Sequence, residues 1–197
     1  MTTGNAYTGA YQFNENGTLT AVNRGAALAN HNVVYVLPTE NEWYKAAYFK
    51  AGGGGYSQYA SGLNAIPTHG TGDGWNYYSS VNGFVNSSPN NTWDVGFGGQ
   101  EQNGTYDMMG NVWEWNESAW DGTLDNMTEA RVRRGGSYFT HYDRLKSDHR
   151  DITFPDYNDK YTGFRIVSYY GIPEPSSILL MAMVGGGGLF MRRMSGR

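Results

Sequence analysis

The sequence contains no cysteine among its 197 residues. This absence excludes disulfide bonds, catalytic thiols and metal sites built from thiolates. Charge is also sparse, at 16% of the chain, and residues 1–171 hold eleven basic and seventeen acidic residues. Their formal charge of −6 leaves no basic stripe to neutralise phosphates, which argues against a nucleic-acid partner and agrees with cation binding.

Long hydrophobic runs are absent from residues 1–171, and residues 1–20 lack the basic start and apolar run of a signal peptide. Glycine and tyrosine are abundant instead, with 28 Gly, 16 Tyr and 6 Trp. Such a chain is rich in loops, and its aromatic side chains must supply the core. We therefore expect one α+β domain over residues 1–171, with few helices, followed by a separate segment over 172–197.

Periodicity and turn residues place the expected elements. Thr39 followed by Glu42 forms a capping-box pattern, which predicts a helix that runs to about residue 50. Residues 52–102 are expected to be loop, because they are rich in Gly, Asn, Ser and Tyr. The strands are predicted over residues 6–13, 18–22, 33–37, 106–116, 131–138 and 162–169.

The segment 110–115 has the composition of a tight turn that enters a strand. Gly110 and Asn111 tolerate a positive φ angle, and alternation along the strand predicts Trp113 and Trp115 on one face, in the core. Glu114 beside these aromatics needs a partner, because an unpaired buried carboxylate is costly. Two kinds of partner remain open: an arginine, such as Arg134 or Arg165, or a calcium ion.

The end of the chain combines Pro173-Glu174-Pro175, an apolar run over 178–191 and the arginines Arg192, Arg193 and Arg197. Fourteen apolar residues make about 21 Å of helix, which is a marginal span for a core of about 30 Å. This order resembles the PEP-CTERM sorting signal of Gram-negative bacteria. The resemblance implies a transient helical membrane anchor, an exosortase as processing partner, and a final location at the cell surface or in the extracellular matrix. A sorting signal without a signal peptide leads us to expect an N-terminally truncated chain.

Four segments in order carry a second resemblance: LPTENEW (37–43), YDMMGNVWEW (106–115), RGGSY (134–138) and GFR (163–165). They are similar to the formylglycine-generating enzyme, or sulfatase-modifying factor, family. The resemblance implies a variant of the C-type lectin fold, with the first strands and helix of that fold missing here. In the last segment we expect Phe164 to point inward and Arg165 to reach a carboxylate.

The same resemblance implies calcium as a structural cofactor. Its first site would use Asn111, the Val112 carbonyl and Glu114, helped by Gly110. A second site would use Asn76 and Tyr77, although no acidic ligand within 82–91 matches the family pattern.

Catalytic members of the family bind copper through two cysteines, and the spacing places those positions at Thr140 and Leu145. Neither residue provides the soft thiolate that binds Cu(I). We therefore expect no copper and no formylglycine formation. Nearby, the loop 141–151 holds His141, His149 and three aspartates, which is either a solvated polar loop or a non-cysteine metal site.

These observations favour an exported, non-catalytic module stabilised by calcium, with a polysaccharide or a protein of the extracellular matrix as its ligand. The expected binding residues are Trp75, Tyr78, Trp93 and His141, because loops of Tyr, Asn, Ser and Gly suit adaptable recognition. Two alternatives stay open: a diverged oxidoreductase that uses the 141–151 loop, and a structural coat component without a discrete ligand.

Overall fold

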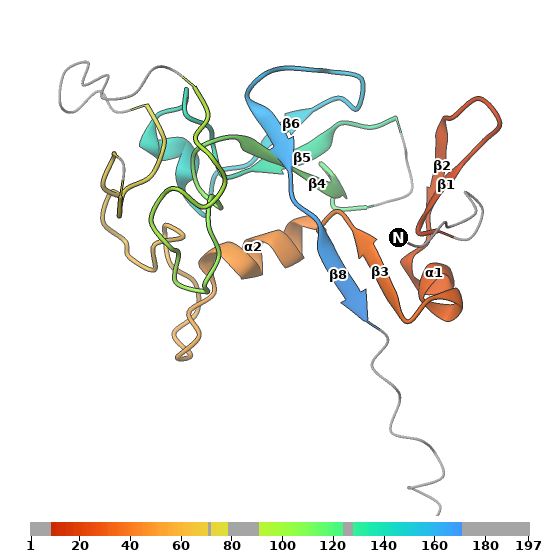
Figure 1. Ribbon diagram of the computed structural model, residues 1–197, viewed down its shortest axis with the longest axis horizontal. Helices are drawn as coiled ribbons and strands as arrows, with labels where there is room; N and C mark the ends of the chain where they lie inside the picture. The colour runs from red at the N-terminus through yellow and green to blue at the C-terminus, as the bar shows by residue number, and fades with distance from the viewer. Residues whose placement is uncertain (1–8, 71, 79–90, 124–127, 171–197) are drawn as a thin grey trace, which may run out of the picture.

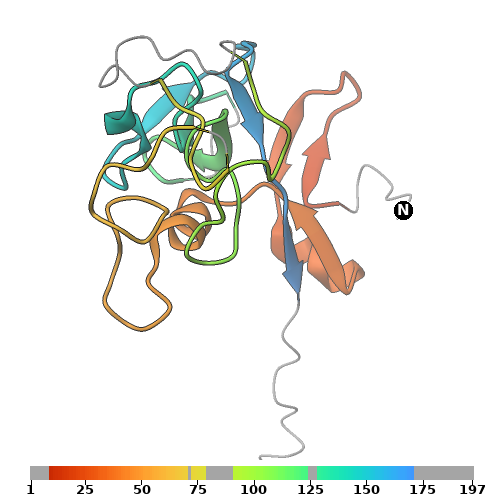
Figure 2. The same cartoon turned by 60° about the vertical axis from the view of Figure 1, so that its left-hand side comes forward.

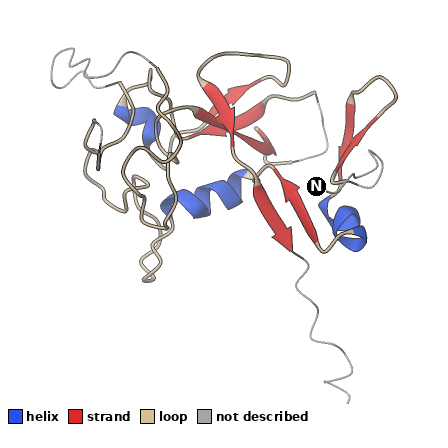
Figure 3. Ribbon diagram, in the orientation of Figure 1, coloured by secondary structure: helices blue, strands red, loops and turns tan. Residues whose placement is uncertain are grey.

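The computed structural model describes residues 9–70, 72–78, 91–123 and 128–170. Within these ranges the fold has two short α-helices, one 3-10 helix and eight strands joined by long loops (Figures 1 and 3). In chain order the elements are β1 (Tyr11–Phe13), β2 (Leu19–Val22), α1 (Arg24–Asn30), β3 (Val33–Val36), α2 (Glu40–Tyr48), β4 (Trp113–Ala119), β5 (Arg131–Arg134), η1 (Tyr142–Leu145), β6 (Asp151–Thr153), β7 (Thr162–Phe164) and β8 (Val167–Tyr170). The expected mixed fold with few helices is confirmed.

A four-stranded sheet with the order β6-β5-β4-β7 forms the centre of the fold. The β4–β5 and β5–β6 pairs are antiparallel, whereas β4 and β7 run parallel. Strands β3 and β8 form a separate antiparallel pair that joins residues 33–36 to residues 167–170 (Figure 1). The hairpin β1–β2 lies on one side of the central sheet, and the long loops gather on the other (Figure 2).

Helix α2 begins as its capping box predicts. The Thr39 side chain accepts from the Glu42 amide, and the Glu42 carboxylate accepts from the Thr39 amide. Helix α1 was missed by the sequence analysis, because its seven residues lie in a polar stretch with little periodicity. Its local signal is Asn23, whose side chain accepts from the Ala26 amide at 2.8 Å and so caps the helix.

The main core lies between α2 and the loops that follow it. It is built chiefly from aromatic side chains and methionines, as the composition indicated. Trp43 and Tyr48 of α2 are fully buried, and their rings meet edge to face with centroids 5.8 Å apart. The buried members of this cluster are Trp43, Ala47, Tyr48, Tyr59, Ala60, Tyr77, Met108, Met109 and Leu145.

Two expectations about side-chain direction were wrong. Trp115 is only half-buried and lies outside the main core, because the face of β4 that meets α2 carries Glu114. Phe164 points outward and is 69% exposed, since β7 is the edge strand of its sheet.

The strand predicted over 131–138 ends at Arg134, because Gly135 and Gly136 have φ angles of 91° and 74°.

The sorting segment 172–197 lies outside the described residues. Among the residues that the structure describes, no helix has the length and hydrophobicity needed to span a bilayer.

Candidate functional site

The turn that leads into β4 is held by close backbone contacts. Gly110 and Asn111 have φ angles of 79° and 61°, as the sequence predicted. The Asn111 amide donates to the Asn76 carbonyl at 2.7 Å, and the Gly110 amide donates to the Gly135 carbonyl at 2.8 Å. A side chain at position 110 would collide with the Asn76 backbone, so this position requires glycine for space as well as for conformation.

Glu114 has an arginine partner. Its carboxylate accepts from the Arg165 Nε and Nη2 atoms and from the indole Nε1 of Trp43, each at 2.5 Å. Burial raises the pKa of Glu114 above its usual value, although the bonds from Arg165 and Trp43 oppose that shift. The expectation that Arg165 reaches a carboxylate is confirmed. Arg134, the other candidate partner, instead pairs with Glu40 at 2.6 Å.

Two more carboxylates surround the same guanidinium. Besides Glu114, both Glu101 and Asp107 lie close enough to Arg165 to raise its pKa, although burial acts in the opposite direction. Burial raises the pKa of Glu101 to about 8. Arg165 is half-buried and binds Glu114 directly, whereas Glu101 and Asp107 influence it through their charge alone. The sequence analysis missed Glu101 and Asp107. The signal that could have indicated Asp107 is the preference of aspartate for turns, and its φ angle in the structure is 59°.

Asn111 and Asn76, which the sequence analysis assigned to two different calcium sites, touch each other. The Asn76 Nδ2 atom donates to Asn111 Oδ1 at 3.2 Å, and the Trp93 amide donates to the same oxygen at 2.8 Å. This oxygen already has two donors, so a calcium ion would have to displace them. The Tyr77 hydroxyl donates to the Pro67 carbonyl at 2.6 Å and is buried. In the structure these side chains thus act as the framework of the loops.

The oxygens of Glu114 already accept from Arg165 and Trp43, so a calcium ion there would have to displace these donors as well. Glu114 is the one acidic ligand of the expected set, and the backbone carbonyls of Gly110 and Val112 lie four and two residues before it. Calcium accepts this mixture of carboxylate and carbonyl oxygens. Within the described ranges, no group of three or more His, Asp or Glu side chains is arranged as a ready metal site.

Thr140 and Leu145, where the resemblance places the family's copper ligands, both lie beside Gly136. A methyl group on Gly136 would come within 2.6 Å of Leu145 Cδ2 and 2.9 Å of Thr140 Oγ1. The Thr140 hydroxyl is engaged locally, since it accepts from the Ser137 amide at 2.8 Å and donates to the Ser137 carbonyl at 3.0 Å. Leu145 is fully buried in the main core. The structure therefore brings the two positions together but fills them with a hydroxyl and an alkyl group.

The charged side chains of the loop 141–151 form pairs with nearby side chains. His141 Nδ1 lies 3.1 Å from Asp143 Oδ1, and Arg144 Nη1 lies 3.3 Å from His149 Nε2. Asp151 pairs with Arg133 at 3.0 Å. Burial, and then the charge of Arg144, lower the pKa of His149. His141 and Asp151 thus each have a partner of opposite type, while His149 lies beside a cation.

Two of the four expected ligand-binding residues lie next to the Thr140 position. Residues Tyr78 and His141 form a parallel backbone bridge, and the Tyr78 amide donates to the Thr140 carbonyl at 2.8 Å. Trp75 and Trp93 are half-buried and lie on the loops around Gly98 and Gly99. Both indole N–H groups are buried without a hydrogen-bond partner. Tyr78 is the most exposed of the four, at 38%.

Comparison with known proteins gives a consistent result. Residues 6–169 match the family described as the sulfatase-modifying factor enzyme 1-like domain. The chain is 32% identical over 152 residues to the inactive C-alpha-formylglycine-generating enzyme 2 of Mus musculus, covering 70% of this chain and 44% of the mouse protein. It is 31% identical over 161 residues to the formylglycine-generating enzyme of Thermomonospora curvata, covering 66% of this chain and 48% of that enzyme.

Among solved structures, the crystal structure of CarF superposes with a TM-score of 0.50 at 26% identity, covering 69% of this chain and 48% of CarF. The chain spans about half the length of the curated relatives that it matches. The family match covers most of the chain and includes all four motifs, the Glu114–Arg165 pair and the two positions beside Gly136. The chain therefore belongs to the sulfatase-modifying factor family, which includes the formylglycine-generating enzymes.

Proposed function

We propose that this chain is a non-catalytic, calcium-stabilised binding domain of the family that works outside the cell. The observation that carries the proposal is the filling of the two copper-ligand positions by Thr140 and Leu145. A hydroxyl that is engaged with Ser137 and a buried alkyl group supply no thiolate for Cu(I). The similarity to a mouse protein that is named inactive also supports the proposal that this chain is non-catalytic.

The ligand surface of the proposal consists of Trp75, Tyr78, Trp93 and His141. The backbone bridge between Tyr78 and His141 holds two loops together at the position where the enzymes of the family carry copper. Aromatic and polar side chains on loops present broad, adaptable contact area. The proposed ligand is a polysaccharide or a protein of the extracellular matrix.

Calcium belongs to the proposal as a structural cofactor. Its support is that two carboxylates, Asp107 and Glu114, act on one guanidinium, that of Arg165. Bound calcium would reduce the repulsion among these carboxylates and so stabilise the turn at residues 107–111. The proposed ligands are Glu114 and the carbonyls of Gly110 and Val112.

We expect the purified protein to contain calcium and no copper, and to leave a cysteine-containing peptide unoxidised. Elemental analysis and mass spectrometry of the peptide measure both results. Removal of calcium with a chelator is expected to lower the midpoint of thermal unfolding, and calcium addition to restore it.

Tightly bound redox-active copper or iron would contradict the non-catalytic assignment. Loss of that metal in His141→Ala and His149→Ala would then favour a diverged oxidoreductase that uses the 141–151 loop. The matched control is Lys146→Ala, which removes another basic residue of the same loop and keeps both histidines.

The proposed location of the protein is the cell surface or the extracellular matrix of a Gram-negative bacterium, which it reaches through exosortase processing. We expect a secreted reporter fused to residues 172–197 to be cleaved near Pro173-Glu174-Pro175 in an exosortase-containing host. Replacement of these three residues by alanine should leave the reporter uncleaved in the membrane fraction, which immunoblotting of fractionated cells detects. Equal release of both fusions would contradict the sorting assignment.

A further inference from the structure

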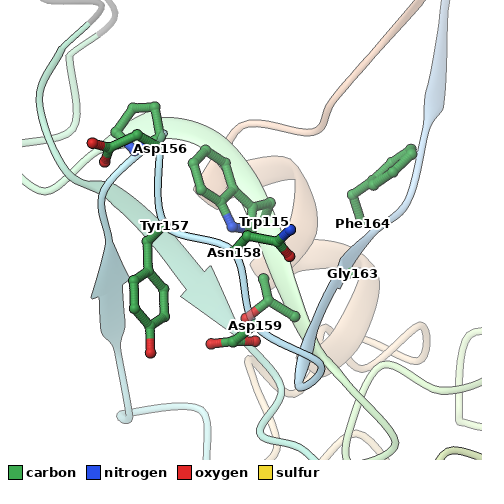
Figure 4. Close-up of a pocket in the computed structure, with 9 residues that line it drawn as sticks. Trp115, Asp156, Tyr157, Asn158, Asp159, Gly163 and Phe164 are labelled. Carbon is green, nitrogen blue, oxygen red and sulfur yellow. The ribbon is translucent and has the colours of Figure 1, made fainter.

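A depression between β4, β7 and the loop that joins β6 to β7 has a volume of about 370 Å³. Trp115 of β4 lies in its middle, with Asp156 of the loop on one side and Phe164 of β7 on the other (Figure 4). None of these residues belongs to the ligand surface proposed above. The depression is thus a separate candidate site.

The walls of the depression expose aromatic surface. Tyr157 is 60% exposed and Phe164 is 69% exposed, although large aromatic side chains usually find a packing partner. With the half-buried Trp115 they give three aromatic side chains around one opening. The faces of such rings attract cations, and tryptophan attracts them best.

The charged groups of the lining are all carboxylates. Asp159 accepts from Arg133 Nη1 at 3.1 Å and from the Tyr161 amide at 2.8 Å, so it is held in place. The same arginine also pairs with Asp151 at 3.0 Å, and this group of three therefore keeps one net negative charge. Asp156 is exposed and adds a second negative charge. The depression repels anions and favours a positively charged ligand.

A smaller cavity of about 90 Å³ shares Trp115 and Pro155 with the depression. Its apolar wall includes Leu19, Val22 and Leu37. Asn116 lines it as well and is fully buried, and no donor among the described residues reaches its Oδ1 atom. Because an unsatisfied buried acceptor is costly, this oxygen favours a ligand that carries a hydrogen-bond donor.

We propose that the depression and the smaller cavity beside it, which share Trp115 and Pro155, bind a small organic ammonium compound that also carries a hydroxyl or amino group. The ammonium group lies between Trp115 and Tyr157, beside Asp156. The donor group enters the smaller cavity and donates to Asn116 Oδ1. The volume of the smaller cavity accommodates a short polar chain in place of several water molecules.

Choline is the probe for a first test, because it combines a quaternary ammonium group with a hydroxyl. Its neutral isostere 3,3-dimethylbutan-1-ol has the same shape, and ethyltrimethylammonium lacks the hydroxyl. By isothermal titration of the full chain, we expect choline to bind about tenfold more tightly than the neutral alcohol and several-fold more tightly than ethyltrimethylammonium.

Variants at exposed positions keep the test independent of folding. Asp156→Asn and Tyr157→Ala are each expected to weaken choline binding about fivefold or more. The control Tyr35→Ala removes a tyrosine that is 65% exposed on β3, outside both cavities, and should leave the affinity unchanged. Equal affinity for choline and the neutral alcohol, no measurable choline binding, or unchanged affinity in both site variants would overturn the proposal.

Discussion

Arg165→Ala is expected to lower the free energy of unfolding by about 3 to 5 kcal/mol, because it leaves a buried carboxylate without its counter-charge. Glu114 is 5% exposed, and two of its three hydrogen bonds come from Arg165. The remaining bond from Trp43 cannot neutralise a full charge. Urea unfolding in the presence of a chelator measures the loss without a contribution from calcium.

The double variant Glu114→Gln/Arg165→Ala distinguishes charge from packing. It should be more stable than Arg165→Ala alone, because the neutral amide no longer needs a cation. The matched control is Arg144→Ala, which breaks a pair with Asp143 whose partners are each 52% exposed. Exposed pairs contribute at most about 1 kcal/mol, so an equal effect of Arg165→Ala and Arg144→Ala would contradict the buried-pair account.

Glu101→Gln is expected to stabilise the protein increasingly as the pH rises from about 5 to about 8. Burial raises the pKa of Glu101 from 4.5 in the unfolded chain to about 8 in the folded protein. Between these values the folded state holds the extra proton, so this group makes the free energy of unfolding fall as the pH rises. By pH 8 the variant should be more stable than the parent by up to about 4 kcal/mol.

The substitution preserves the local geometry, because the glutamine oxygen can still accept from the Met109 amide, which lies 3.2 Å from Glu101 Oε1. Groups with shifted pKa values that do not interact with Glu101, such as Glu117 and His149, remain in both proteins, and their contributions cancel in the difference. Glu15→Gln, at an exposed turn position, is the control and should change the pH profile little. Parallel profiles for Glu101→Gln and the parent protein would contradict the prediction.

Local interactions were readable from the sequence. The capping box of Thr39 and Glu42 and the positive φ angles of Gly110 and Asn111 depend on a few neighbouring residues, and both predictions were confirmed. The four ordered motifs led to the family, and the residues at positions 140 and 145 led to the expectation that copper does not bind. Short elements with weak patterns, such as α1 and β6, escaped because three to seven residues carry little periodicity.

Side-chain direction and partnership depended on contacts between distant segments. Alternation placed Trp115 and Phe164 inward, but the central sheet meets α2 through Glu114 and ends at β7, which leaves Trp115 half-buried and Phe164 exposed. The sequence left Glu114 between calcium and two arginines, and the register of β4 with β7 brings Arg165 beside it.

The sequence by itself thus determined the family, the loss of the copper-binding thiolates and the acidic, aromatic character of the chain, because these are properties of residue identity and order. Only the tertiary structure decided which charges meet and which aromatic rings are exposed. The gathering of Glu101, Asp107 and Glu114 around Arg165 requires segments up to 64 residues apart to pack together. The free energy of that packing comes from the whole core, and no local pattern records it.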